Sequence, residues 1–248
     1  MEHPALAQTS HRPWPLPAAP WTWQQSWLDL AFLHYRAAPG PIERLLPRGI
    51  RLQQFDGSAW LGVVPFRMAR LGPRGLHGLA RLPDFPELNL RTYVEAEGKP
   101  GVWFFSLDAA SRLAVFGGRR FFNLPYLHAA MAQERSGAWI DFRSRRHGAR
   151  AEFRGRYRPV GPRLSPRPGS FAHWATERYA LYAVSRRGAL RRVEVHHAPW
   201  PLHEAEVELE HNSIVAAAGL EVLADRPICH FSPGVDVVSF GAESVRAG

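Results

Sequence analysis

Proline and glycine are spread along the whole chain, and they constrain its fold more than any other feature. The 248 residues include 22 prolines and 21 glycines. These residues separate short apolar or alternating segments, a pattern typical of many strands joined by turns. No change in composition divides the chain. The sequence therefore predicts one domain over residues 21–240, a flexible Pro-rich N-terminus over 1–20 and a C-terminal tail over 241–248.

Two turn signals predict hairpins. Asp56-Gly57 separates the predicted strands 50–55 and 58–68, and a four-residue loop ending at Pro100 separates 87–95 from 102–108. The segment 27–35 fits either a strand or a helix. Further strands are predicted over 126–135, 139–144, 151–157, 179–184, 190–196 and 228–240. Short helices are predicted over 39–46, 109–122 and 171–174, the last capped by Ser170.

The chain is strongly basic, with a formal net charge of +9. Lys99 is the only lysine, and the arginines are scattered among apolar segments. The densest arginine groups are Arg143, Arg145, Arg146 and Arg150, followed by Arg154, Arg156 and Arg158. This excess favours anionic ligands, but nucleic acid is not expected as the main partner, because no stacking-aromatic and basic motif accompanies it.

The cysteine content and the hydropathy pattern indicate in which cellular compartment the protein is expected. Cys229 is the only cysteine, so no internal disulfide can form and a reducing cytoplasm is expected. No segment has the roughly 18–20 consecutive apolar residues of a membrane span. The first twenty residues do not follow the pattern of a signal peptide.

The best candidate site is the predicted hairpin of residues 87–108. Alternation along a strand sets Glu87, Asn89 and Arg91 on one face. A four-residue loop would place Asn89 across from Asp108, and Arg91 across from Ser106. Arg91 would then bind an anionic ligand, Glu87 or Asp108 would transfer protons, and Asn89 and Ser106 would orient the ligand. A solvated face or a structural ion-pair network is the alternative interpretation.

Two other groups are weaker candidates. His196 and His197 point to opposite faces of a strand, and no histidine spacing matches a metal site, so no metal or cofactor is predicted. His196, next to Pro199-Trp200-Pro201, is a candidate pocket residue. Glu177 could orient Arg178 or act as a base, although such a set more often forms an ion pair at a helix end. Phosphate-loop, dinucleotide-binding and nucleophile-elbow motifs are absent from the sequence.

Several separated motifs, in order, resemble the bacterial YqjF-like family of uncharacterised proteins. They are WLDLAFLHYRAAPGPIERLLPRGIRLQQFDGSAWLGVVPFRM, FPELNLRTYV, GVWFFSLDAASRLAVFGGRRFFNLPY, TERYALY, HHAPWPL and NSIVAAAGL. The match runs from about Trp21 to Phe240. That family is remotely similar to the acetoacetate decarboxylase-like superfamily. The resemblance implies a mainly β (α+β) fold: a closed, cone-shaped antiparallel β-barrel with a few short peripheral helices and an internal ligand cavity.

The resemblance also bears on the chemistry. In the superfamily's decarboxylases a lysine forms a Schiff base with a keto acid, assisted by an acidic residue and an arginine. Glu87 and Arg91 correspond to those two residues. The lysine-bearing strand corresponds to 102–110, which holds no lysine, and Lys99 falls in the predicted turn. Schiff-base decarboxylation is therefore not expected.

Two functions remain open from the sequence. The first is a small-molecule site for a keto or carboxylic acid, with turnover left undecided. The second is a non-catalytic ligand sensor or a scaffold for protein or nucleic-acid interaction. The aromatic N-terminal stretch would suit an interface, and a homo-oligomer fits the resemblance.

Overall fold

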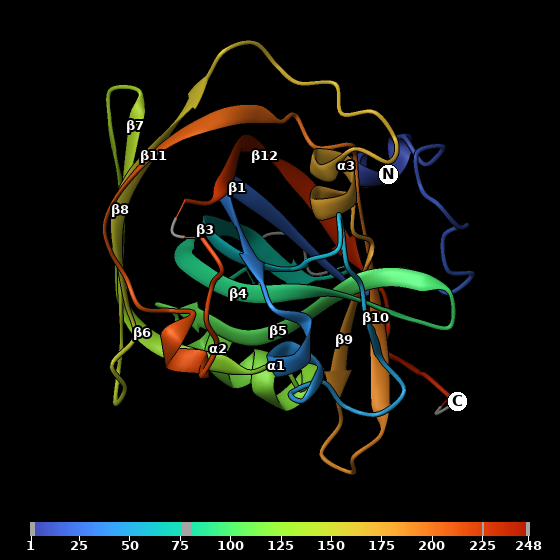
Figure 1. Cartoon of the computed structure of the whole chain (residues 1–248). Helices are drawn as coiled ribbons and strands as arrows, with labels where there is room; N and C mark the ends of the chain where they lie inside the picture. The colour runs from blue at the N-terminus through green and yellow to red at the C-terminus, as the bar shows by residue number, and fades with distance from the viewer. Residues whose placement is uncertain (1–2, 76–80, 225, 247–248) are drawn as a thin grey trace.

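The computed structural model describes residues 3–75, 81–224 and 226–246. Within them thirteen strands pair into one sheet (Figure 1). The strands are β1 (Trp23–Ala37), β2 (Arg51–Leu52), β3 (Ala59–Pro73), β4 (Phe85–Ala96), β5 (Lys99–Ala109), β6 (Tyr126–Ser136), β7 (Trp139–Arg146), β8 (Glu152–Val160), β9 (Ala180–Val184), β10 (Leu190–His197), β11 (His203–Asn212), β12 (Ile228–Ser239) and β13 (Glu243–Ser244). The mainly β class is confirmed, and the segment 27–35 lies in β1.

The helices are short, and all but the first lie between strands. They are η1 (Pro4–Ala7), α1 (Pro39–Glu43), α2 (Arg112–Gly117), the π-helical turn η2 (Gly118–Phe122), α3 (Phe171–Thr176) and η3 (Ala216–Ala218). Serine caps start two of them: Ser111 Oγ accepts a hydrogen bond from the Ala114 N–H, and Ser170 Oγ accepts one from the His173 N–H. The predicted cap at Ser170 is confirmed.

Seven strands pair in a circuit that returns to its starting strand. β5 pairs with β4, which is followed by β3, β1, β12, β10 and β9, and β9 pairs with β5 again. We call this the seven-strand circuit. A second series of pairings, β6–β7–β8–β11, connects β5 to β12. It forms the curved outer wall seen beside the circuit in Figure 1.

The sheet is not wholly antiparallel, which corrects one part of the expected fold. β5 runs parallel to β6 on one side and to β9 on the other. Between β5 and β6 the chain passes through α2 and η2, and such a crossover is what a parallel neighbour in the same sheet requires.

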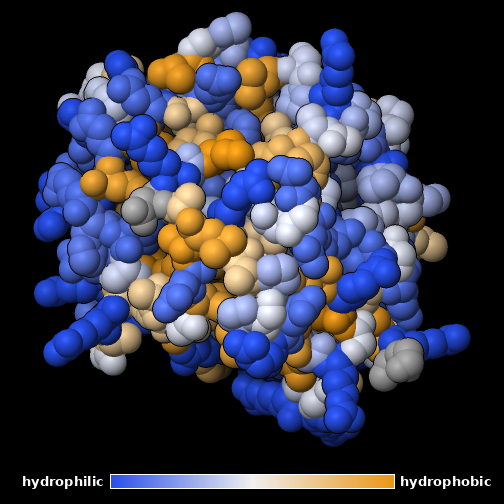
Figure 2. Space-filling model, viewed as in Figure 1, coloured by the Kyte–Doolittle hydropathy of each residue, from blue (hydrophilic) through white to orange (hydrophobic). Residues whose placement is uncertain are grey.

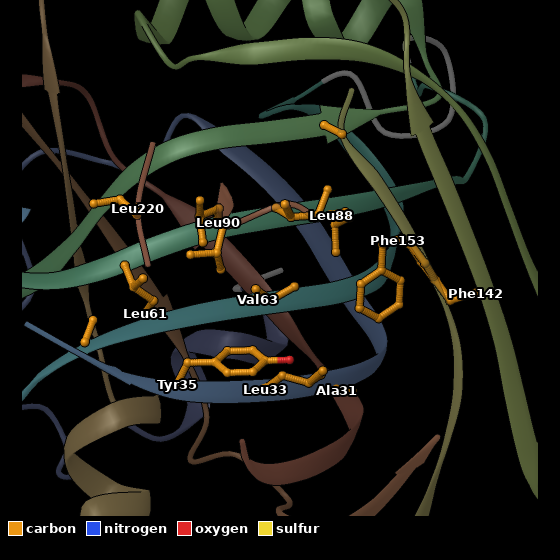
Figure 3. Packing of buried hydrophobic residues seen from close by; sticks show 14 of the residues in the cluster. Ala31, Leu33, Tyr35, Leu61, Val63, Leu88, Leu90, Phe142, Phe153 and Leu220 are labelled. Atoms are coloured by element: carbon orange, nitrogen blue, oxygen red, sulfur yellow. The ribbon is translucent and has the colours of Figure 1, made fainter. Parts of the chain in front are cut away.

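An apolar core fills the space between the circuit and the outer wall. Leu88 and Leu90 of β4 are fully buried there, and Phe142 of β7 and Phe153 of β8 pack in the same cluster (Figure 3). The sequence predicted that the Leu88/Leu90 face would pack on a core. The opposite face of β4, which carries Glu87 and Asn89, points to the other side.

Both predicted hairpins differ from the structure: the first in its strand pairing and the second in the length of its turn. Asp56 and Gly57 do form a tight turn, with positive φ angles of 52° and 67°. However, only Phe55 and Ser58 pair across it, and the short strand β2 pairs with β4 instead of β3. β4 and β5 are joined through Glu97 and Gly98, a two-residue turn with positive φ angles at both positions, and not through the predicted four-residue loop.

A β-bulge interrupts the pairing of β4 with β5. Arg91 lies opposite Phe104, but the preceding residue, Leu90, lies opposite Ser106. Phe105 is therefore an extra residue on β5. Because side chains alternate along a strand, one extra residue inverts the faces of everything beyond it.

Parts of the described N-terminal segment pack against the circuit. Ala5 and Arg12 are buried, and Arg12 Nη2 lies 2.7 Å from Glu194 Oε2 of β10. His11 Nε2 lies 2.8 Å from the carbonyl oxygen of His197. These contacts tie residues 11 and 12 to β10, and the flexibility of residues 1–20 stays a prediction. Residues 1–2 and 247–248 of the predicted termini lie outside the described residues.

One of the two dense arginine groups is neutralised by glutamates on the neighbouring strand. Arg154, Arg156 and Arg158 of β8 form ion pairs with Glu210, Glu208 and Glu206 of β11, in that order. The three glutamates therefore offset the positive charge of this arginine group, which the sequence alone shows as a basic run. Elsewhere, on the face shown in Figure 2, hydrophilic side chains predominate and apolar ones lie in patches between them.

Gly101→Ala is expected to lower the free energy of unfolding by about 1–3 kcal/mol, the usual cost of overpacking. An added methyl group would lie 2.4 Å from the carbonyl oxygen of Ala180 and would force β5 away from β9. Gly241→Ala is the control, because its methyl group would meet nothing within 4 Å. Urea unfolding of both variants measures the difference. Equal stability would contradict the close β5–β9 approach.

Candidate functional site

A cavity of about 350 Å³ lies among the strands of the seven-strand circuit. We call it the outer cavity. Each of the seven strands contributes to its lining, and α2 and η2 lie at its end. The lining includes Trp23, Gln25 and Trp27 of β1, Phe66 and Met68 of β3, Glu87 and Asn89 of β4, Phe104 and Leu107 of β5, Leu181 of β9, Val193 and Val195 of β10, Ser239 of β12, Leu113, Ala114 and Phe116 of α2, Phe121 of η2, and Tyr126 of β6. The walls are mainly apolar.

Glu87 is the ionisable carboxyl group of the outer cavity. Its side chain is buried, and Tyr126 donates a hydrogen bond from its hydroxyl to Glu87 Oε2 over 3.1 Å. Burial raises the pKa of Glu87 to about 8, while hydrogen bonds from Tyr126 and Asn89 offset part of that rise. At neutral pH Glu87 is therefore mainly protonated, and it can donate a proton.

A smaller cavity of about 60 Å³ lies beside the outer one. We call it the inner cavity. Both cavities are lined by Trp27, Phe66, Asn89, Phe104, Leu181 and Val195. Arg91, Thr176, Arg178 and His197 line the inner cavity alone. The guanidinium and imidazole groups thus lie at the inner cavity, whereas the outer cavity is mainly apolar apart from a few polar side chains such as Glu87.

Arg91 and Arg178 bring two guanidinium groups to the inner cavity. Arg91 donates from Nη2 to the Ala175 carbonyl oxygen over 3.1 Å, and its guanidinium carbon lies 5.4 Å from the ring centroid of Phe32. Arg178 donates to the carbonyl oxygen of Trp174 and to Gln53 Oε1. Burial lowers the pKa of Arg178 to about 9. Arg91 Nε and Arg178 Nη2 are buried without a hydrogen-bond partner among the described residues.

Ser106 and Asp108 do not join this site, which corrects the predicted cluster. Beyond the bulge, Asp108 lies opposite Leu88 and shares its face. There Arg146 Nε lies 2.9 Å from Asp108 Oδ1, and Arg146 Nη2 donates to Ser106 Oγ over 2.9 Å. Of the five clustered residues, Glu87, Asn89 and Arg91 line the cavities, whereas the other two form a polar group between the circuit and β7.

His196 also lies away from the cavities. It is fully buried beside the N-terminal segment, with Nε2 lying 3.1 Å from the Gln8 carbonyl oxygen and the ring stacked on His11. Its neighbour His197 lines the inner cavity instead, as alternation along β10 requires. Burial lowers the pKa of His197 to about 3, so this imidazole is neutral at physiological pH.

The third candidate group divides in the same way. Arg178 and Thr176 line the inner cavity, whereas Glu177 accepts hydrogen bonds from the Tyr179 hydroxyl and from the Trp200 N–H. Glu177 therefore links the end of α3 to Tyr179 and Trp200.

The sequence does not single out Tyr126 or His197, although each lines one of the cavities. Strand alternation would have identified His197, while Tyr126 reaches Glu87 only through the packing of β6 beside β5.

Lys99 lines neither cavity. Its Nζ lies 2.5 Å from Glu194 Oε1 and 5.6 Å from the ring centroid of Trp14. Because it is the chain's only lysine, no lysine side chain is available in the cavities. Schiff-base chemistry in the cavities would need a lysine amine there, and the expectation that it is not used stays a prediction.

Two absences concern the part of the chain that the structure describes. No group of three or more His, Cys, Asp or Glu side chains there could hold a metal ion. Within the same residues, none of the helices has both the length and the apolar character needed to cross a membrane.

Comparisons with known proteins cover almost the whole chain. Residues 24–236 match the model of a family, DUF2071, that is described as an uncharacterized conserved protein. The uncharacterized protein YqjF of Bacillus subtilis (strain 168) is 39% identical over 224 residues, which make up 90% of this chain and 92% of YqjF.

Solved structures with the same fold are much more distant in sequence. The enduracididine biosynthesis enzyme MppR, complexed with pyruvate, has a TM-score of 0.68 at 15% identity, over 92% of each chain. Acetoacetate decarboxylase from Legionella pneumophila has a TM-score of 0.65 at 14% identity, over 96% of this chain and 93% of the decarboxylase. At such identities the likeness concerns the fold alone.

Proposed function

The chain belongs to the DUF2071 family of uncharacterised conserved proteins, and from that premise we propose that it binds a small organic acid within the seven-strand circuit. In this proposal the circuit acts as a closed, cone-shaped barrel around the two cavities. The ligand carboxylate lies in the inner cavity, and the rest of the ligand extends toward Glu87. MppR, which shares the fold, is described as complexed with pyruvate, an acid of this class.

The observation that carries the proposal is the unpaired charge of Arg91 and Arg178. The other largely buried arginines each contact a carboxylate: Arg12 contacts Glu194, Arg146 contacts Asp108, and Arg192 contacts Glu97 and Glu243. Among the described residues, no ion pair involves Arg91 or Arg178. Arg178 is buried and Arg91 is half-buried. A buried cation without a counter-ion is costly, so an anionic ligand at the inner cavity would relieve that cost.

The free donors of these arginines suit a carboxylate. Arg91 Nε and Arg178 Nη2 both lack a partner, and a carboxylate can accept one hydrogen bond from each of them. Glu87, which is protonated at neutral pH, would add no repulsion to an incoming anion. We further propose that Glu87 supplies or receives the proton in any reaction at this site, with Tyr126 orienting its carboxyl group.

Arg91→Met is expected to weaken the binding of organic acids about 10- to 100-fold, because a hydrogen bond to a charged group contributes about 1.5–3 kcal/mol. Thermal shift and titration calorimetry with keto, hydroxy and dicarboxylic acids measure the effect. An acid at about 100 times its Kd would stabilise the wild type by about 2.7 kcal/mol.

Arg187→Met is the control for this test. Arg187 is exposed in the turn between β9 and β10, so its loss removes the same charge away from the cavities. The proposal fails if no acid binds the wild type. It also fails if an Arg91→Met protein that folds normally binds the acids as tightly as Arg187→Met does.

A further inference from the structure

The outer cavity is larger than a short acid needs. Its volume of about 350 Å³ equals the liquid volume of about twelve water molecules. A carboxylate held at Arg91 in the inner cavity would leave the outer cavity to the remainder of the ligand. An acid as short as pyruvate would leave most of this apolar space unfilled, and an unfilled apolar cavity lacks favourable contacts.

The walls of the outer cavity suit an apolar body. Trp23, Phe66, Met68 and Leu107 supply aromatic and aliphatic surface from three different strands. Glu87, the acidic group among them, is uncharged below about pH 8 because burial raises its pKa. An apolar chain can therefore pass Glu87 without displacing the hydration of a charged group.

The end of the outer cavity is open to an apolar chain as well. Leu113, Phe116 and Phe121 line the cavity on α2 and η2, yet they are 67%, 65% and 59% exposed. Large apolar side chains that are exposed together at a cavity mouth mark a binding surface. A chain that emerged from the cavity would contact these three side chains and remove them from water.

We propose that the ligand of this site is an amphiphilic monocarboxylic acid, with its carboxylate at Arg91 and Arg178 and a hydrocarbon body that fills the outer cavity and reaches the α2/η2 mouth. This inference rests on the proposed function and adds the class of acid. The two arginines select the head group, and the apolar walls select the length of the body. Short polar acids would occupy only the inner cavity and would leave the outer cavity unfilled.

Straight-chain acids from propionate through hexanoate and octanoate to decanoate test the proposal. Titration calorimetry on the full chain should show one binding site and a Kd that tightens about fourfold for each added methylene, the equivalent of about 0.8 kcal/mol, until the cavity is full. Octylamine, which has the same body and the opposite charge, should not compete. Arg91→Met should weaken every acid in the series by a similar factor.

A cavity-filling variant locates the body of the ligand. Ala114 of α2 lines the outer cavity, so Ala114→Phe should weaken octanoate at least about tenfold while changing propionate little. Ala132→Phe, at an exposed position on β6, is the matched control. Thermal unfolding of both variants verifies that they fold.

The outcomes separate the two proposals. If the acids need Arg91 but bind with the same Kd at every chain length, the amphiphilic ligand is wrong and the organic-acid site stands. If binding tightens with length but ignores both Arg91 and the charge of the head group, or if no acid binds, the proposed function is wrong. If Ala114→Phe leaves octanoate unchanged, the hydrocarbon body does not lie in the outer cavity.

Discussion

Arg146→Met is expected to lower the free energy of unfolding by about 3–5 kcal/mol, because it removes one partner of a buried ion pair. Asp108 and Arg146 have side-chain exposures of 0% and 9%, so water cannot replace the lost contact. Burial raises the pKa of Asp108, and the charge of Arg146 opposes that rise. Without Arg146, Asp108 must fold either as an unpaired anion or in the protonated form. Ser106 loses its hydrogen-bond donor as well.

A double variant distinguishes the ion pair from simple loss of packing. Arg146→Met combined with Asp108→Asn removes the stranded charge and should recover a large part of the lost stability. Arg145→Met, at the exposed neighbouring position on β7, should cost little. Denaturant unfolding gives the free energy of unfolding of each of the three variants. If the single and double variants were equally destabilised, the charge of Asp108 would not be the cause.

Glu87→Gln is expected to remove a large dependence of stability on pH. The folded chain keeps the Glu87 proton up to about pH 8, whereas an unfolded chain releases it near the ordinary value of 4.5. Between these values the folded state binds more protons, so the contribution of Glu87 to stability is complete below 4.5 and is lost as pH rises through 8. Wild type should lose about 5 kcal/mol relative to Glu87→Gln across this window.

The measurement compares urea unfolding of the two proteins at several pH values inside and outside that window. The histidines with lowered pKa values, such as His197, titrate in both proteins, so their effect cancels in the difference. Glu134→Gln, at an exposed position on β6, serves as the control and should keep the wild-type profile. Parallel profiles for wild type and Glu87→Gln would show that Glu87 ionises freely, and the proton-donor role would then be lost.

Alternation along β4 could be predicted from the sequence. Leu88 and Leu90 are the buried face, and Glu87, Asn89 and Arg91 line the cavities on the other. This prediction depends only on the two-residue period of a strand, which the sequence displays directly. The turn at Asp56-Gly57 and the cap at Ser170 are equally local features.

Features that depend on packing between distant segments could not be predicted. Phe105 is one apolar residue in an apolar run, and nothing in that run marks it as the extra one. The alignment of β5 with β4 is settled by the Glu97-Gly98 turn and by the core on both faces. Likewise, the sequence shows Arg178 only as part of a local motif. Its position beside Arg91 arises because α3 and β9 pack against the inner cavity.

The bulge at Phe105 has a consequence for comparing relatives with one another. Counting along β5 from its first residue assigns positions 106 and 108 to the cavity, whereas the folded strand presents Leu107 there. An alignment that sets a relative's reactive residue against Ser106 or Asp108 would transfer its role to side chains bound by Arg146, behind the sheet. Homologous positions on this strand therefore have to be matched separately on either side of the bulge, and position 107 is the one that faces the outer cavity.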